Sequence, residues 1–135
     1  MEKIKVTVDY TDKNYSAATA DIGGVVLVTH KTLEGLKKAF DSSLKFHIEG
    51  CIADGDELPE WAVKGSYEAQ YEYTVSALLQ NLSGVLTRSA ISRVTGINER
   101  QLGHYATGRS TPRARQRERI IDGIHRIGKE FMSVV

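Results

Sequence analysis

The hydrophobic pattern of this 135-residue chain changes its period near residue 74, and that change limits the folds open to it. Over residues 2–10 apolar and polar side chains alternate, which indicates a strand with one buried face. Beyond residue 74 apolar side chains recur every three or four positions, which indicates amphipathic helices. We therefore expect an α+β domain over residues 1–73, followed by an all-α domain over residues 74–135.

The first domain is expected to contain strands and one long helix. Alternating or β-branched runs predict strands at residues 2–10, 15–20, 25–29 and 66–73. The strand at 25–29 is β-branched in the way that is typical of a central strand. A helix capped by Thr32 is expected to stop at Gly50, with a loop over residues 51–65. The order β-β-β-α-β predicts a helix packed on one face of a small sheet.

The second domain is expected to contain four helices. Their positions are predicted as residues 75–82, 87–94, 99–106 and from Thr111-Pro112 onward. Proline is favoured at the first helical position, which suggests that Pro112 opens the last helix. Its apolar seam of Ile120, Ile124, Ile127 and Phe131 is larger than one small domain needs. The seam either packs against the helix at 75–82 or pairs two chains. We expect a homodimer formed through the C-terminal half, and a higher oligomer stays open.

Charge is distributed unequally between the two halves. Residues 1–73 contain eight lysines and no arginine against thirteen acidic residues, a net charge of −5. Residues 74–135 contain nine arginines and one lysine against four acidic residues, a net charge of +6. Guanidinium groups suit phosphates and guanine edges better than ammonium groups do. The asymmetry indicates two surfaces with different partners.

The segment 88–108 has the spacing of a helix-turn-helix. Gly96 supplies the turn, Ile97 fills the angle between the helices, and Asn98 caps the second helix. Leu102 and Tyr105 fall on the inner face of that helix. The outward positions are Glu99, Arg100, Gln101, Gly103 and His104.

Those outward residues suit the edges of DNA bases, because a recognition helix lies in the major groove. Arg100 can bind guanine with two hydrogen bonds, Glu99 can accept one from cytosine, and His104 lies one turn further on. Phosphate contacts are expected from Arg88, Arg109 and Arg113. The alternative is a structural pair of helices whose polar face only meets solvent.

The stretch from Leu79 to Ile127 resembles the Cro/repressor helix-turn-helix family. The resemblance lies in Thr-Gly-Ile-Asn-Glu-Arg-Gln-Leu at 95–102 and in Tyr-Ala-Thr-Gly-Arg-Ser-Thr-Pro at 105–112. It implies that the base-contacting positions are Glu99, Arg100 and His104, with Arg109 at a backbone or minor-groove position. Gly103 departs from the family, which usually has a larger residue there.

The first half, together with this tail, resembles a HicB-type antitoxin. The matching segments are Tyr15-Ser-Ala-Ala-Thr-Ala-Asp-Ile-Gly-Gly24, Val28-Thr-His-Lys-Thr-Leu-Glu-Gly-Leu36 and Phe46-His-Ile-Glu-Gly50. The resemblance implies a truncated ribonuclease-H-like domain that binds and blocks a small basic, mRNA-cleaving toxin of the HicA type. It also implies that the tail binds double-stranded operator DNA and represses its own operon. Ala20 stands where that family commonly has proline.

Catalytic and metal chemistry is not expected. Asp9 and Glu72 fall on the polar faces of their strands, away from the helical carboxylates of Glu34 and Asp41. The histidines are scattered and Cys51 is the only cysteine, so neither a metal site nor an intrachain disulfide is predicted. No cofactor is expected. The main alternative to an antitoxin is a repressor whose N-terminal domain senses a small ligand or another protein.

The chain is expected to be cytoplasmic. No apolar run approaches the roughly 18 residues that span a bilayer, and the N-terminus lacks the apolar core of a signal peptide.

Overall fold

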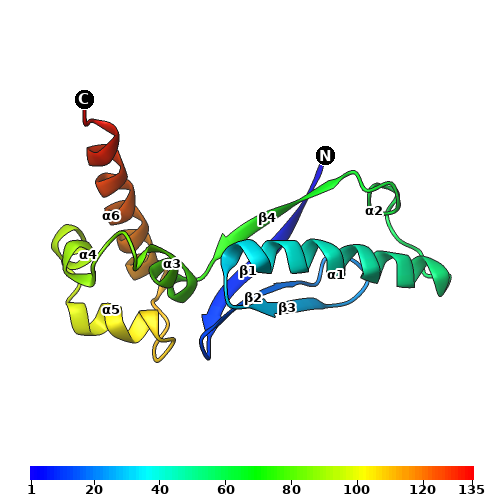
Figure 1. Ribbon diagram of the computed structural model, residues 1–135, viewed down its shortest axis with the longest axis horizontal. Coiled ribbons are helices and arrows are strands. Elements are labelled where there is room, and N and C mark those ends of the chain that lie inside the picture. The colour runs from blue at the N-terminus through cyan, green and yellow to red at the C-terminus, as the bar shows by residue number, and fades with distance from the viewer. The chain divides into compact units, whose positions relative to one another are not determined.

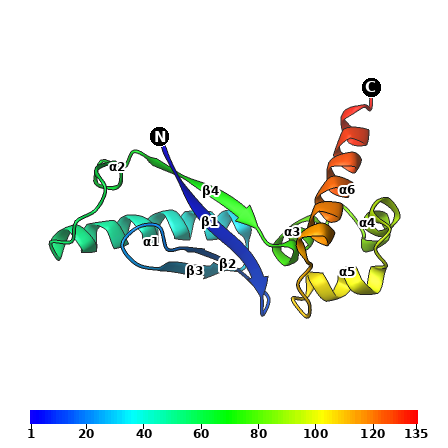
Figure 2. The ribbon, with the colours of Figure 1, turned by 180° about the vertical axis from the view of Figure 1, so that it is seen from behind.

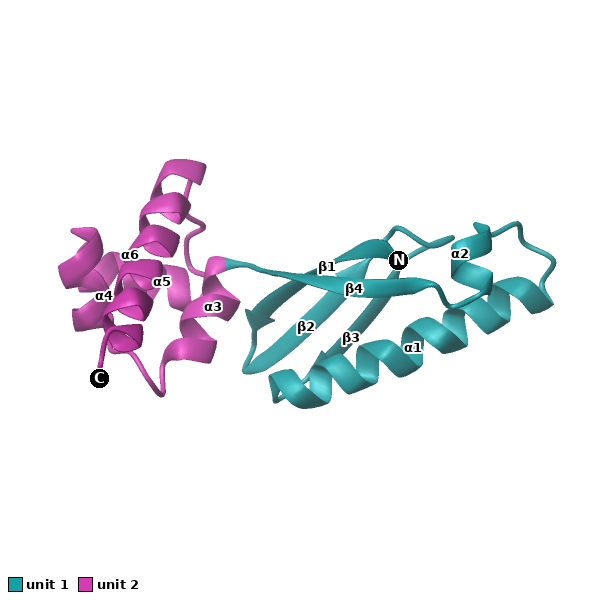
Figure 3. Ribbon diagram, turned by 90° about the horizontal axis from the view of Figure 1, so that it is seen from above, with its two compact units in different colours: residues 1–74 teal, residues 75–135 magenta.

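The computed structural model describes residues 1–135, which form two compact units. Unit 1 is Met1–Thr74 and unit 2 is Val75–Val135 (Figure 3). The chain is mixed α+β, with one four-stranded sheet and six helices, and the sheet lies wholly in unit 1. The expected α+β class is confirmed. None of the helices has the length and apolar content needed to cross a membrane.

The sheet has the strand order β3-β2-β1-β4. Its strands are β1 (Glu2–Thr11), β2 (Asn14–Thr19), β3 (Val26–His30) and β4 (Tyr67–Tyr73). β2 pairs antiparallel with β1 and β3, whereas β4 returns to pair parallel with β1. The prediction that the third strand is central was wrong, because β3 lies at an edge. β1 is central instead, through a pairing between the two ends of unit 1.

The helix α1 (Leu33–Ala53) covers one face of the sheet (Figure 1). Its buried stripe of Leu36, Phe40, Leu44 and Ile48 supplies half of a core that Ile4, Val6 and Val8 complete from β1. Thr32 caps the helix as predicted, since its hydroxyl accepts the Gly35 amide at 3.1 Å.

The end of α1 differs from the prediction. The helix continues through Gly50 to Ala53, and the chain turns only at Gly55, whose φ is +78°. Because the helix continues past Gly50, Cys51 is buried together with Ile48. A helix that ended at Gly50 would have left Cys51 outside the core. The predicted loop at 51–65 is also partly wrong, because it contains α2 (Glu60–Val63). Trp61 of α2 lies edge-on to Tyr67 of β4, with ring centroids 6.3 Å apart.

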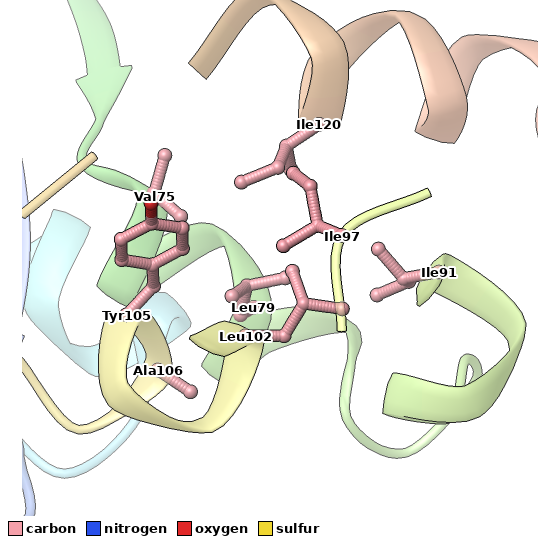
Figure 4. Packing of buried hydrophobic residues seen from close by; sticks show 8 residues of the cluster. All are labelled: Val75, Leu79, Ile91, Ile97, Leu102, Tyr105, Ala106 and Ile120. Carbon is pink, nitrogen blue, oxygen red and sulfur yellow. The ribbon is translucent and has the colours of Figure 1, made fainter. Parts of the chain in front are cut away.

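Unit 2 packs four helices around one apolar cluster. They are α3 (Val75–Leu82), α4 (Arg88–Thr95), α5 (Glu99–Ala106) and α6 (Ala114–Met132). Figure 4 shows the side chains of the cluster, which are Val75, Leu79, Ile91, Ile97, Leu102, Tyr105, Ala106 and Ile120. Every helix of the unit contributes, so the surface of each is held in place by a common core.

The last helix begins later than predicted. Its N-cap is Arg113, with extended backbone at φ −71° and ψ 163°, so Pro112 precedes the helix instead of opening it. Proline suits such extended segments as well as it suits a first helical turn. The far end of α6 extends beyond the three shorter helices (Figures 1 and 2). Ile120 and Ile127 of its seam are buried, but Phe131 is 59% exposed.

Candidate nucleic-acid interface

The turn between α4 and α5 is built by two residues with special backbone or capping roles. Gly96 ends α4 in the left-handed conformation, with φ +75°, and its amide donates to the Ser92 carbonyl at 2.8 Å. Two residues later, the Asn98 side chain accepts the Gln101 amide at 2.8 Å and starts α5. A left-handed residue is cheap only for glycine. The sequence therefore determines this turn locally.

The inner face of α5 is fixed by burial. Leu102 is fully buried and Tyr105 is 6% exposed, while Ile97 fills the angle between α4 and α5 (Figure 4). The Thr95 hydroxyl donates to the Ile91 carbonyl at 2.8 Å and accepts the Ile97 amide at 3.2 Å. With this side anchored, α5 presents the opposite side to solvent.

That outward side carries the residues predicted to read bases. Glu99 and Arg100 are exposed and His104 is half-buried. Arg100 and His104 are one turn apart, so they follow the same stripe of the helix. Glu99 occupies the first turn, where a carboxylate interacts favourably with the helix dipole.

Gln101 has a partner of its own. Its amide Nε2 donates to the Ser110 hydroxyl at 3.1 Å, and the Ser110 amide donates to the His104 carbonyl at 3.2 Å. These two bonds tie the segment 107–113 to α5. Ser110 was missed by the sequence reasoning, and its only signal is a small polar residue shortly after Gly108. Gln101 therefore positions the loop that carries Arg109.

Arg88 and Gly103 lie against each other. A Cβ at position 103 would lie 3.0 Å from Arg88 Nη1, so the guanidinium rests directly on the backbone of α5. The glycine that departs from the family pattern thus makes room for this arginine. Arg88, which begins α4, is brought beside the outward side of α5.

Eight of the nine arginines of the chain fall into two groups. Six are exposed and form no ion pair with a carboxylate, namely Arg88, Arg93, Arg100, Arg109, Arg113 and Arg115. Arg109 lies in the segment that Gln101 and Ser110 hold against α5, and Arg113 is the N-cap of α6. No hydrogen bond or ion pair joins Arg113 to the other residues predicted to bind DNA. The positive charges of these six arginines face solvent without a carboxylate to neutralise them.

Two other arginines bind the end of α4 instead. Arg119 Nη2 donates to the Thr95 carbonyl at 2.6 Å, and Arg126 Nη1 donates to the Val94 carbonyl at 3.2 Å. Both satisfy carbonyls that the last turn of a helix leaves without partners, and their charge suits the negative end of the helix dipole. The sequence reasoning missed this role. Its signal is the spacing of seven residues, which places both arginines on one face of α6.

α6 can approach α4 closely because of Gly123. A Cβ there would lie 2.7 Å from Thr95 Cγ2 and 3.0 Å from Val94 Cγ2. The close approach brings Arg119 and Arg126 within reach of the α4 carbonyls.

Unit 1 has no comparable functional cluster. The carboxylate of Asp9 accepts the Thr74 hydroxyl at 2.7 Å and the Tyr10 amide at 2.8 Å. Cys51 is buried, and burial together with the nearby Asp56 carboxylate raises the pKa of its thiol. No three histidine, cysteine or acidic side chains gather into a set that could hold a metal ion.

Comparison with known proteins gives no match to this chain, whether among family models, curated proteins or solved structures.

Proposed function

We propose that unit 2 is a helix-turn-helix DNA-binding domain with α5 as its recognition helix. The observation that carries this proposal is the outward side of α5. It exposes Arg100, leaves His104 half-exposed above the buried core of unit 2, and is flanked by exposed arginines that no carboxylate neutralises. Such a surface suits DNA, whose phosphates dominate affinity and whose major groove admits one helix.

Each side chain has a distinct part in the proposal. Arg100 binds a guanine edge and Glu99 accepts from cytosine, with His104 contacting the next step along the groove. Arg88, Arg109 and Arg113 bind phosphates and fix the register of the helix. Gln101 acts on DNA through the loop that it holds.

We further propose that the whole chain is an antitoxin. In this proposal unit 1 is a truncated ribonuclease-H-like domain that neutralises a small basic toxin of the HicA type, which cleaves mRNA, and unit 2 represses the operon. The support is the resemblance of both halves to HicB-type antitoxins and the net charge of −5 over residues 1–73. A toxin that grips RNA presents a positive face, and complementary charge speeds such encounters.

The DNA proposal is tested by selecting a preferred site from random duplexes with the full chain. Arg100→Ala should weaken binding to that site by about 1–3 kcal/mol and spare a scrambled duplex. Arg113→Ala should weaken both duplexes alike and lower the slope of log K against log salt by about 1. Lys45→Ala in unit 1 is the matched control and should change neither. Equal losses on both duplexes for Arg100→Ala would remove its assignment to base reading.

The antitoxin proposal is tested by growth of cells that express the neighbouring small basic protein. The full chain should restore growth, and so should the Arg100→Ala chain at equal expression, because neutralisation is assigned to unit 1. Loss of rescue with Arg100→Ala would place the toxin site on unit 2. A neighbour without toxicity would favour the repressor that senses a ligand.

A further inference from the structure

The outer edge of β3 lacks the charged residues and prolines that usually protect an edge strand. Its sequence, Val26-Leu27-Val28-Thr29-His30, contains no lysine, no carboxylate and no proline. Edge strands usually carry such residues, since an unprotected edge pairs readily with another chain. β4, at the other edge, exposes Glu68 and Glu72. The two edges of the sheet therefore differ, and only β3 is suited to pairing.

Exposed apolar side chains gather beside this edge. A groove of about 500 Å³ runs between β3 and α1, and its lining includes Val25, Leu27 and Phe46. These side chains are 71%, 63% and 77% exposed, respectively. Successive strand residues face opposite sides of a sheet. Val25 and Leu27 therefore face the side opposite the buried Val26, whereas Phe46 lies on α1, so an added strand would cover apolar surface on both sides of the sheet.

Gly50 also lines this groove, one helical turn after Phe46. A glycine inside a helix costs about 1 kcal/mol relative to alanine. A Cβ at Gly50 would meet nothing within 4 Å, so no contact in unit 1 requires the glycine. Phe46 is therefore an exposed bulky side chain, and Gly50 leaves an open gap beside it on the same face of α1.

We propose that a second copy of this chain occupies the groove, related to the first by a two-fold axis. In a two-fold interface, residue i contacts residue j and j contacts i. Phe46 then fills the gap at the partner's Gly50, and the partner's Phe46 fills the gap at Gly50 of the first copy. On the strands, Val25 meets the partner's Leu27. The two β3 edges pair antiparallel and join the two four-stranded sheets.

Charge favours the same arrangement. Asp54 and Asp56 line the groove beyond the C-terminal end of α1, whereas the opposite end of β3 leads into Lys31. Antiparallel pairing turns each basic end toward the partner's acidic end, and parallel pairing would place like charges together. The carboxylates of the groove are confined to Asp54 and Asp56, and the rest of its surface is apolar at Val25, Leu27 and Phe46. The groove therefore suits a partner with one basic end and an apolar middle better than a uniformly basic partner such as a toxin. The observations therefore favour a second copy, and the inference stands without the proposed DNA binding.

The proposal is tested by the mass of the full chain in solution, measured by light scattering over a range of concentrations. Phe46→Lys and Leu27→Lys should each halve the mass at concentrations where the natural chain associates, since both place uncompensated charge in the interface. Val63→Lys is the matched control, because Val63 is 53% exposed and lies outside the groove. Far-UV circular dichroism of each variant should match that of the natural chain.

Cross-linking provides a second measurement that does not depend on loss of association. One chain carries Phe46→Cys and another carries Gly50→Cys, both with Cys51→Ser. Mild oxidation of the mixture should give the mixed disulfide dimer in clear excess over either homodimer. An unchanged mass for both lysine variants, or no preference for the mixed product, would overturn the proposal. If both lysine variants keep the mass of the natural chain but no longer restore growth of cells that express the toxin, the groove would be assigned to the toxin instead.

Discussion

The two units use their cations differently. In unit 1, four of the eight lysines pair with carboxylates, as in Lys45–Asp41 at 3.1 Å and Lys5–Glu72 at 3.2 Å. In unit 2, Arg119 and Arg126 bind the carbonyls at the end of α4, and six of the other arginines face solvent with no carboxylate partner. The net charge of a unit therefore does not tell how many of its charged side chains lie unpaired on the surface, where a ligand could meet them. Only the geometry separates arginines that hold the fold from those whose charge is free to meet a ligand.

The two kinds of contact also differ in strength. The lysine pairs of unit 1 are at least half exposed, and exposed pairs contribute about 0–1 kcal/mol. A hydrogen bond from a charged group to a carbonyl is worth about 1.5–3 kcal/mol. We therefore expect side-chain polar contacts to contribute more to the stability of unit 2 than to that of unit 1.

The largest expected effect tests whether the units are separate at all. Leu102 is fully buried in unit 2, and Leu102→Ala should lower its free energy of unfolding by about 2–5 kcal/mol. Amide exchange in unit 1 should stay unchanged. The matched variant Leu44→Ala should do the reverse. Loss of protection in both units with either variant would mean that they unfold as one, and the comparison would fail.

The next effect tests the capping arginine. Arg119→Met keeps most of the side-chain length but removes the bond to Thr95, which should destabilise unit 2 by about 1.5–3 kcal/mol. Urea denaturation of the full chain, followed by signals from unit 2, would measure it. The salt slope of DNA binding should not change at temperatures where the variant is folded. A fall in that slope would place Arg119 on the DNA surface.

A third effect compares the turns of the two units. Gly96 of unit 2 has φ +75°, so Gly96→Ala should cost about 1–2 kcal/mol. In unit 1, Asp12 and Lys13 hold positive φ values of 50° and 67° without being glycine. Lys13→Gly should therefore stabilise unit 1 by up to about 1 kcal/mol, because the turn of a tight hairpin favours glycine there. Thermal denaturation would show opposite shifts, and shifts of the same sign would contradict this account.

The smallest effect concerns the exposed lysine pairs. Lys38 lies 3.5 Å from Glu34, one helical turn away, and both side chains are about 80% exposed. Lys38→Met should change the stability of unit 1 by only about 0.3–0.5 kcal/mol, and high salt should remove the difference. A loss comparable to that of Arg119→Met would erase the distinction drawn between the units.

Local chemistry explains why parts of the structure were predictable. The turn at Gly96 and Asn98 depends on one left-handed residue and one side-chain cap, both determined by residues within a few positions. The same holds for Thr32 at the start of α1. The outward positions on α5 follow directly from the buried positions of Leu102 and Tyr105.

Contacts between distant segments explain the errors. The edge position of β3 follows from the pairing of β1 with β4, which no local pattern encodes. Glycine is common at the end of a helix, which is why Gly50 was predicted to end α1. The burial of Cys51 favours another turn of helix instead. The roles of Arg119 and Arg126 depend on α6 crossing α4 at Gly123, and an exposed arginine that binds DNA would have the same sequence signature.

The parallel pairing of β1 with β4 has a consequence for biosynthesis. β1 leaves the ribosome before β4, and residues 12–66 must be made before this second neighbour begins. At about 5–20 residues per second, this edge stays unpaired for roughly 3–11 s. Throughout that time Ile4, Val6 and Val8 lie on a strand with one open edge, the kind of segment that mispairs with other nascent chains. The domain is therefore most prone to aggregation during its own translation, and slower decoding of residues 54–66 would prolong that period.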